Sequence, residues 1–186
     1  MEFIGQMMVG LPRGTEENER KTAEDICSMG ADGARIYPTV VFEETALADL
    51  TRNGAYFPLT TETSVIRAAN ALSVFIDRNV PVIRIGLQSG EALEQGIGVA
   101  AGGYHPAVGE LAYARCFRDF MEQALAKVDT AGKFAVVRVH PSDVSKVIGQ
   151  RGENRNYLIK TFSLKGFRVL PDGNAVKNHP NISILQ

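Results

Sequence analysis

Arginines on two strand-like stretches carry the most distinctive chemistry in this sequence. Arg35 and Tyr37 alternate along one stretch and so share a face, as Arg84 and Gly86 do along another. An inward-facing arginine is costly unless an anion or a carboxylate compensates its charge. The pattern favours a bound carboxylate or phosphate. The alternative is a structural salt bridge, for which the sequence offers Glu43, Glu44 and Glu110.

A Gly-rich loop follows the second of these stretches and contains Tyr104 and His105. Histidine exchanges protons near neutral pH, so His105 is a candidate proton donor or substrate contact. The alternative, which a lone histidine before a proline favours, is a hydrogen bond that fixes the loop. The sequence assigns no residue a catalytic role.

A Gly-x-x-Gly turn near the C-terminus offers a different chemistry. Two helix-like stretches meet at this turn, and small residues there let a sugar–phosphate backbone approach closely. The candidate nucleic-acid contacts are Lys146, Gly149, Gln150, Arg151 and Gly152. The alternative is a packing turn that binds nothing.

The bulk composition sets broad limits on function. The chain has 186 residues, 45% of them hydrophobic and 22% charged, with a net charge of −1, which is typical of a globular protein. Because the total charge is near zero, any nucleic-acid footprint must be local. No apolar run is long enough to span a membrane and no signal peptide is visible, so we expect a cytoplasmic protein without a membrane partner.

The two cysteines, Cys27 and Cys116, lie far apart in helix-like stretches with apolar neighbours. We expect both to be buried, reduced thiols. They lack the spacing of metal ligands, so the cysteines of this chain cannot hold a zinc ion or an iron–sulfur cluster, and no metal ligand is predicted.

The elements that must position these residues alternate between strand and helix. Predicted strands span 3–10, 33–42 and 80–87, and predicted helices span 16–30, 60–79 and 107–128. Thr15 is a typical N-cap of the first helix. Continuous apolar strands that alternate with amphipathic helices indicate a parallel α/β sheet, with ligands bound in the loops after the strands. Residues 88–106 are predicted to be a loop.

After residue 130 the pattern changes to strand, short helix, Gly-x-x-Gly turn, helix and strand, a small α+β unit of βααβ order to which residues 181–186 could add a further strand. We therefore place a domain boundary between residues 129 and 130, giving a first domain at 1–129 and a second at 130–186.

The first domain contains four motifs in order: GLP-x-GT at 10–15, RIYPT at 35–39, IRIGLQ at 83–88 and YHPAxGEL at 104–111. This series resembles the second half of a radical S-adenosylmethionine (SAM) enzyme, in its oxygen-independent coproporphyrinogen III oxidase-like and elongator catalytic subunit-like branches. The resemblance covers residues 3–125 and implies half of a TIM-type parallel β/α barrel. A half-barrel leaves its first strand as an open edge.

The resemblance also implies roles for residues. Gln6 would contact the ribose of SAM, with a polar residue in a solvated barrel as the alternative. The implied cofactor-binding set is Gln6, Gly10, Pro12, Arg35, Tyr37, Arg84, Gly86 and Leu87, and the implied substrate-binding set is Tyr104 and His105.

The family's CxxxCxxC motif, which holds a [4Fe–4S] cluster, is absent. The resemblance therefore implies that the cluster and the reductive cleavage of SAM belong to a longer parent enzyme, and that this chain alone is inactive. We expect a C-terminal portion whose first strand is covered by the missing N-terminal half-barrel or by a second copy of the chain.

The segment 139–162 resembles a KH domain, which implies RNA binding at the Gly-x-x-Gly turn. An RNA or tRNA substrate fits the elongator-like branch, whereas a porphyrinogen fits the other. The alternative function is a stand-alone, non-catalytic RNA-binding module.

Overall fold

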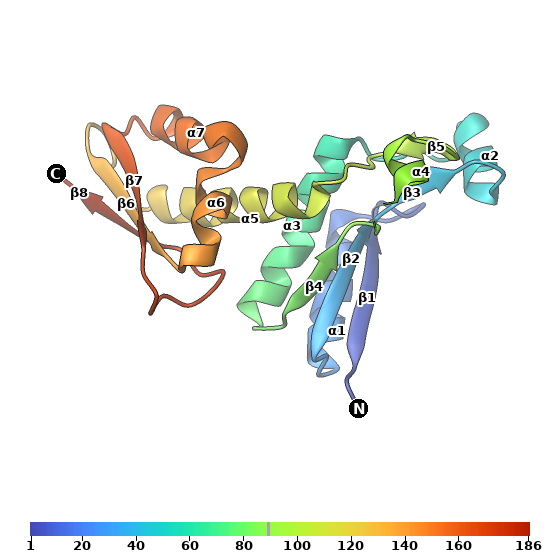
Figure 1. Ribbon diagram of the computed structural model, residues 1–186, viewed down its shortest axis with the longest axis horizontal. Helices are drawn as coiled ribbons and strands as arrows, with labels where there is room; N and C mark the ends of the chain where they lie inside the picture. The colour runs from blue at the N-terminus through green and yellow to red at the C-terminus, as the bar shows by residue number, and fades with distance from the viewer. Residues whose placement is uncertain (89) are drawn as a thin grey trace. The chain divides into compact units, whose positions relative to one another are not determined.

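The computed structural model describes residues 1–88 and 90–186 and contains two compact units, Met1–Ala112 and Tyr113–Gln186 (Figure 1). Both units combine a sheet with helices, which confirms the predicted α/β composition. The half-barrel and the KH-like identity of the second unit remain predictions.

The first unit is built on a parallel sheet of three strands in the order β1-β2-β4, with bounds Ile4–Val9, Gly33–Pro38 and Val82–Ile85. All three strands were predicted, and β1 lies at the edge of the sheet as expected. Pairing between β2 and β4 shifts by one residue after Ala34, so that Arg35 lies opposite Arg84. Such a bulge lets two neighbouring residues of the longer strand project on the same side.

Two helices, α1 (Glu16–Ser28) and α3 (Thr61–Asp77), cover one face of this sheet (Figure 1). Thr15 caps α1 as predicted, because its hydroxyl accepts a hydrogen bond from the backbone N–H of Asn18. A capping box completes this start. Met7, Val9 and Ile36 point toward the helices and are buried, so the opposite face carries the intervening residues.

The predicted strand at 33–42 is divided in two. It ends as β2 at Pro38, where the backbone N–H and hydroxyl of Thr39 both donate to the carbonyl of Val9. The chain then forms β3 (Val40–Phe42), which pairs antiparallel with β5 (Val99–Gly102) in a separate two-stranded sheet. The sequence does not indicate this pairing because β5 is short and rich in alanine and glycine.

The predicted loop at 88–106 is therefore wrong in part, since it contains β5 and the short helix α4 (Glu91–Glu94); its residue Ser89 lies outside the described residues. The connection between β3 and α3 contains α2 (Ala46–Arg52), where the sequence indicated a short helical patch. Helix α5 (Val108–Leu125) follows β5 and confirms the third predicted helix.

The second unit contains the sheet β7-β6-β8, in which β6 (Phe134–Val139) pairs parallel with β7 (Gly166–Pro171) and antiparallel with β8 (Asn181–Leu185). Between β6 and β7 lie helix α6 (Val144–Ile148) and helix α7 (Glu153–Thr161). Short 3₁₀ turns, η1 (Pro141–Asp143) and η2 (Gln150–Gly152), precede the two helices. The predicted βααβ order and the additional final strand are confirmed.

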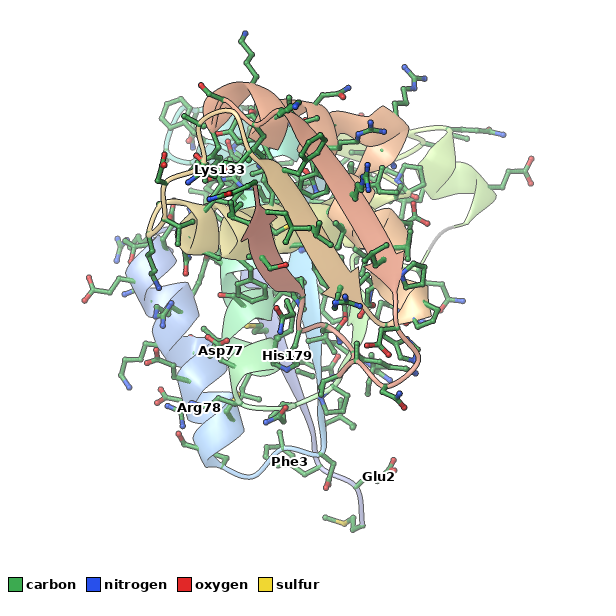
Figure 2. All side chains as sticks on the ribbon, turned by 90° about the vertical axis from the view of Figure 1, so that its left-hand side faces the viewer. Glu2, Phe3, Asp77, Arg78, Lys133 and His179 are labelled. Carbon is green, nitrogen blue, oxygen red and sulfur yellow. The ribbon has the colours of Figure 1, made fainter. Side chains whose placement is uncertain are left out.

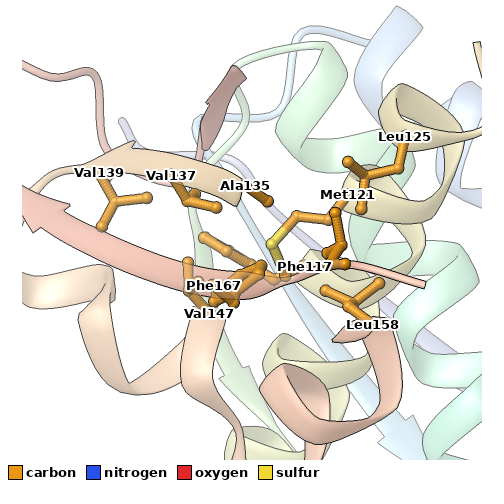
Figure 3. Close-up of a cluster of buried hydrophobic side chains, with 10 residues drawn as sticks. Phe117, Met121, Leu125, Ala135, Val137, Val139, Val147, Leu158 and Phe167 are labelled. Carbon is orange, nitrogen blue, oxygen red and sulfur yellow. The ribbon is translucent and has the colours of Figure 1, made fainter. Parts of the chain in front are cut away.

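One buried cluster forms the core of the second unit (Figure 3). It joins the inner face of the sheet to α6, α7 and the C-terminal half of α5, through Phe117, Met121, Leu125, Ala135, Val137, Val139, Val147, Leu158, Leu164 and Phe167. The two compact units consequently divide within α5, between Ala112 and Tyr113, rather than at 129/130. The apolar face of a continuous helix contributes to two cores, a division that helical periodicity alone does not reveal.

Within the described ranges, no helix is both long and apolar enough to cross a membrane.

Candidate functional site

A row of polar side chains crosses the face of the first sheet that α1 and α3 leave uncovered. The parallel register places Gln6 opposite Arg35 and Arg35 opposite Arg84, so that one residue from each strand contributes to the row. Met8 and Tyr37 form the next row toward the carboxyl ends of the strands. Three of the residues predicted from sequence are thus adjacent on this face.

Arg35 has an unusual environment. Its Nε atom is buried yet has no hydrogen-bond partner among the described residues. The cation opposite it, Arg84, is exposed and donates a single long hydrogen bond of 3.4 Å to Gln88. Like charges directly opposite on neighbouring strands destabilise a sheet, and an unsatisfied buried donor adds to this cost. An anion on this face would compensate both.

The salt bridges offered as the alternative for Arg35 and Arg84 are absent from the described part of the chain, where neither arginine has an acidic partner within 4 Å. Glu43, Glu44 and Glu110 are all exposed. The arrangement therefore favours the ligand-binding interpretation of these two arginines over the structural one.

Gly86 and Leu87 lie just beyond β4. The predicted alternation from Arg84 to Gly86 ends at Ile85, because Gly86 has a left-handed φ of 92° and lies against the Val108 side chain, where a Cβ would collide. Leu87 is partly buried. Both residues lie at the carboxyl end of β4, where their backbone groups could face a ligand.

Tyr104 and His105 lie in the connection between β5 and α5. The Tyr104 hydroxyl is buried and lacks a hydrogen-bond partner among the described residues, like the Nε of Arg35. The Nδ1 atom of His105 accepts a hydrogen bond of 3.1 Å from the backbone N–H of Ala107. His105 thus makes the loop-fixing hydrogen bond offered as its alternative role, which leaves Nε2 as its second ring nitrogen.

The loop after β1 is held by residues that the sequence alone did not single out. Glu19 accepts a hydrogen bond of 2.6 Å from the backbone N–H of Gly10, and the Tyr56 hydroxyl donates one of 2.5 Å to the Gly10 carbonyl. Arg67 donates to both carboxylate oxygens of Glu19, at 2.5 and 2.7 Å. The Glu19 and Arg67 side chains are only 8% and 11% exposed, so this bidentate pair is shielded from water.

These contacts fix both backbone polar groups of Gly10, and with them the two peptide units that flank it, so the loop is formed in advance of any ligand. Gly10 has a φ of 83°, and a Cβ there would collide with Leu59. The next residues, Leu11 to Gly14, form a turn closed by a 2.8 Å hydrogen bond, with Pro12 exposed and Arg13 in the left-handed region at 61°. A non-glycine residue in this conformation costs about 1 kcal/mol or more.

A cavity of about 260 Å³ opens beside this loop. Its lining consists of Gly10, Leu11, Arg13, Gly14, Ala55, Tyr56, Phe57, Leu59 and Arg67. Burial raises the pKa of Tyr56, and the positive charge of Arg67 acts in the opposite direction. The hydroxyl therefore stays protonated and remains the donor to Gly10 near neutral pH.

A sequence signal for this network does exist. Glu19 shares one helical face with Ala23 and Ile26, both of which are buried. A charged residue on the apolar face of a helix requires a buried partner. The same holds for Arg67, which lies between the buried residues Ser64 and Ala71 on α3.

Residues 31–117 match the family described as the Radical_SAM C-terminal domain. The match supports the interpretation of this region as a radical SAM C-terminal portion. It includes Arg35, Arg84, Tyr104 and His105 and ends within α5, so the Gly-x-x-Gly turn lies outside it. No curated protein matches the chain.

The Gly-x-x-Gly turn of the second unit joins α6 to α7, as predicted. Gly149, Arg151 and Gly152 have left-handed φ values of 74°, 52° and 79°, and Gln150 and Arg151 are exposed. A Cβ on Gly149 would lie 2.9 Å from the backbone nitrogen of Asn154, whereas a Cβ on Gly152 would lie 3.8 Å from the Asn156 side-chain nitrogen, an ordinary contact distance. The turn is therefore tight on the Gly149 side and accessible on the Gly152 side.

Two neighbouring side chains support the turn from within the unit. Asn154 is buried and donates hydrogen bonds to the carbonyls of Ala114 and Lys146. The ammonium of Lys146 lies 2.7 Å from Asp143 and 2.8 Å from Asn178, over the Tyr113 ring. Its charge is thus engaged within the unit, and Lys146 is poorly placed for the predicted contact with a nucleic acid.

Proposed function

We propose that this chain is the C-terminal portion of a radical SAM enzyme, and that the uncovered face of its first sheet contacts SAM and substrate. The observation that carries the proposal is the row of Gln6, Arg35 and Arg84, in which the Nε atom of Arg35 has no hydrogen-bond partner among the described residues. Arg35 and Arg84 also lie in the region that matches the family.

The chemistry of SAM fits this row. SAM carries a carboxylate, hydroxyl groups and an adenine ring. Arg35 and Arg84 supply N–H donors for a carboxylate, and the Gln6 amide can both donate to and accept from a hydroxyl. Tyr37 lies one row further along, and the backbones of Gly10, Pro12, Gly86 and Leu87 border the same end of the sheet. When bound, SAM supplies the capacity to abstract a hydrogen atom.

The substrate side is assigned to the loop that carries Tyr104 and His105. The unpartnered Tyr104 hydroxyl supports this assignment, because a buried donor without a partner is costly unless a ligand satisfies it. His105 orients its own loop through Nδ1, which leaves Nε2 to contact a substrate.

A [4Fe–4S] cluster does not fit the residues of this chain. Cys116 is buried, and Cys27 lies in a different helix, where burial raises its pKa and disfavours the thiolate that iron requires. Among the described residues, no group of three His, Cys, Asp or Glu side chains could hold a metal ion. We therefore assign the cluster to other residues of the parent enzyme and expect this chain alone to be inactive.

The open edge of the first sheet is the proposed contact for the missing half of the barrel or for a second copy of the chain. β1 has β2 as its pairing partner and presents its other edge outward. We place the parent enzyme in the cytoplasm.

RNA is the proposed substrate class or partner of the second unit, and the Gly-x-x-Gly turn supports it as a second candidate function. Gln150 and Arg151 are exposed, and the Gly152 side of the turn is less crowded than the Gly149 side, so a sugar–phosphate backbone has room to approach. The other branch that the motifs resemble acts on a porphyrinogen, and a Gly-x-x-Gly turn has no evident role in binding such a substrate.

Equilibrium dialysis of labelled SAM against the full chain tests the main proposal. Changing Arg35→Gln or Arg84→Gln is expected to weaken binding at least about tenfold, because each removes charge-assisted hydrogen bonds to a carboxylate. Arg52→Gln, which removes an exposed arginine paired with Asp49, is the matched control. Equal binding by all variants, or no binding by the original chain, would contradict the assignment of this face to SAM.

The DNA upstream of Met1 gives an independent test of the parent enzyme. An in-frame CxxxCxxC motif is the expected result. A stop codon directly before Met1 would instead favour the stand-alone RNA-binding module.

A further inference from the structure

The two compact units differ sharply in charge. Residues 113–186 contain twelve Lys and Arg and six Asp and Glu, a net charge of +6 with neutral histidines, whereas residues 1–112 contain eight and fifteen, a net charge of −7. The near-neutral total of the chain conceals this division. A small basic domain attracts polyanions, so the second unit carries the local footprint that the composition of the whole chain does not reveal.

Most acidic residues of the second unit are already paired. Asp119, Asp129 and Asp143 each contact one basic residue, and Glu122 and Glu153 both approach Arg118. Within the described part of this unit, the basic residues without an acidic partner are Lys127, Arg138, Arg151, Arg155, Lys160, Lys165, Arg168 and Lys177. These residues are the ones available to a partner.

Arg138 and Arg168 belong to the face of the β7-β6-β8 sheet that the helices leave uncovered. Ala135, Val137 and Phe167 point into the core, so their strand neighbours point outward. The register gives three outward rows: Leu185, Phe134 and Gly166; Ser183, Val136 and Arg168; and Asn181, Arg138 and Leu170. None of these residues is acidic. Figure 2 looks onto this sheet, with Lys133 labelled beside it.

Phe134 packs over Gly166 at one end of this face. Its ring occupies the space that a side chain on Gly166 would need. The guanidinium of Arg168 and the ammonium of Lys165 lie 5.5 and 5.3 Å from the ring centroid. Cations held on an aromatic ring are pre-positioned, and an arginine plane is itself a surface on which a base can stack.

Exposed apolar side chains border the cations. Leu185 and Leu170 are 54% and 37% exposed, at opposite corners of the face. A surface that combines stacking planes, apolar contacts and unpaired cations has the composition of sites that bind single-stranded nucleic acids. A duplex presents its phosphates but keeps its bases stacked inside, so it would leave the apolar part of this face unused.

We propose that the uncovered face of the β7-β6-β8 sheet binds single-stranded RNA, with Arg138 and Arg168 on the phosphates and a base stacked on the Phe134–Arg168 pair. The inference rests on the RNA-binding role proposed for the second unit, and it adds a surface formed by different residues from the Gly-x-x-Gly turn. Charge complementarity selects the occupant, because the face has cations and no acid to attract a basic or neutral partner.

Fluorescence anisotropy of the full chain with a labelled single-stranded RNA of mixed sequence, about 15 nucleotides long to span one site of this kind, tests this proposal. The sheet variant combines Arg138→Gln with Arg168→Gln, and the turn variant combines Gln150→Asp with Arg151→Asp. A matched control, Arg20→Gln with Arg52→Gln, removes two exposed arginines from the acidic unit. Melting curves are recorded for every variant, and each sheet arginine is also changed alone, so that a folding defect in the pair leaves a usable comparison.

We expect the sheet variant to bind at least about tenfold more weakly at a low salt concentration of about 50 mM. The slope of log affinity against log salt should fall by about 1.4, at roughly 0.7 for each single-strand phosphate that no longer meets a cation. The control should stay within about twofold of the original chain, because its arginines lie outside the face. An acidic peptide of equal charge should compete poorly, because it cannot stack.

Three other outcomes would contradict the proposal, and each shows which part of it fails. If the turn variant alone loses affinity, the sheet assignment fails and the RNA-binding role stands. If the original chain binds no RNA at low salt, both fail. Equal competition by the acidic peptide would make the face a surface for acidic proteins, which also overturns the assignment to RNA.

Discussion

The two sheets of this molecule leave different kinds of arginine on their uncovered faces. On the first sheet, Arg35 is partly buried and its Nε has no partner in the described part of the chain. On the second, Arg138 and Arg168 are exposed to water. A third kind, Arg67, is buried and bonded to both oxygens of Glu19. We propose that burial and pairing together, rather than charge alone, distinguish structural arginines from those available to a ligand.

The difference has a physical basis. An exposed guanidinium is hydrogen-bonded to water, so it needs no partner within the fold. It attracts a polyanion mainly through its long-range electrostatic field. A buried guanidinium must be paired within the fold or be satisfied by a bound ligand. We therefore expect the first face to recognise one small anion specifically, and the second face to bind phosphates with little selectivity and strong salt dependence.

Breaking the buried Glu19–Arg67 pair should give the largest change in the free energy of unfolding. Glu19→Gln removes the charge that compensates Arg67 and weakens the hydrogen bond to Gly10, so we expect a loss of about 3 kcal/mol in the free energy of unfolding. Urea denaturation followed by circular dichroism measures it. Glu24→Gln, which removes an exposed carboxylate from the pair with Arg20, should cost less than about 0.5 kcal/mol.

A loss below about 1 kcal/mol for Glu19→Gln would weaken the comparison, because Arg67 would then resemble the exposed arginines. SAM binding by the same variant provides a second measurement, because Glu19 holds the loop at Gly10 that borders the cavity. If the Glu19–Arg67 pair holds this loop in place, the affinity for SAM should fall together with the free energy of unfolding.

Removing Arg35 should change the free energy of unfolding in the opposite direction. Arg35→Met deletes an unsatisfied buried donor and one of two like charges, so the unliganded chain should gain about 1 kcal/mol in the free energy of unfolding. Arg168→Met on the second sheet should change it by less than about 0.5 kcal/mol. A destabilisation of more than about 1 kcal/mol by Arg35→Met would show that Arg35 is a structural residue like Arg67.

The sequence predicts much of the fold because its local signals agree with one another. The parallel strands, the Thr15 cap and the βααβ order all rest on hydrophobic period and capping chemistry, which act over a few residues. The division within α5 and the pairing of β3 with β5 depend on contacts between distant segments. A continuous helical pattern and a short Gly- and Ala-rich strand give little indication of such contacts.

The candidate site shows the same limit. Alternation along the strand predicts that Arg35 and Tyr37 share a face, but only the register places Arg84 directly opposite Arg35. Lys146 follows the pattern of a basic residue near a Gly-x-x-Gly turn, yet Asp143 and Asn178 engage its ammonium. The opposite net charges of the two units follow from the sequence alone, because a division at 129/130 gives the same values of −7 and +6.

The smallest expected effect concerns two tyrosines, one in each unit. Burial raises the pKa of Tyr56, against the opposing charge of Arg67. Burial also raises the pKa of Tyr113, and there Cys116 and Asp143 act in the same direction. A group whose pKa is raised on folding contributes stability that is fully present below its unfolded pKa, about 10 for tyrosine. That contribution is lost as the pH rises through the folded pKa.

Absorbance titration of the phenolates, with denaturation near neutral pH and above about pH 10, measures this difference. The original chain should lose stability in the alkaline range, and Tyr56→Phe and Tyr113→Phe should each remove part of the loss. Burial raises both pKa values, but Arg67 lowers that of Tyr56, whereas Cys116 and Asp143 raise that of Tyr113 further. Arg67→Met should therefore raise the pKa of Tyr56 and leave the titration of Tyr113 unchanged. If Arg67→Met changed the pKa values of both tyrosines, Arg67 would not act locally. The distinction between paired and unpaired arginines would then lose its electrostatic basis.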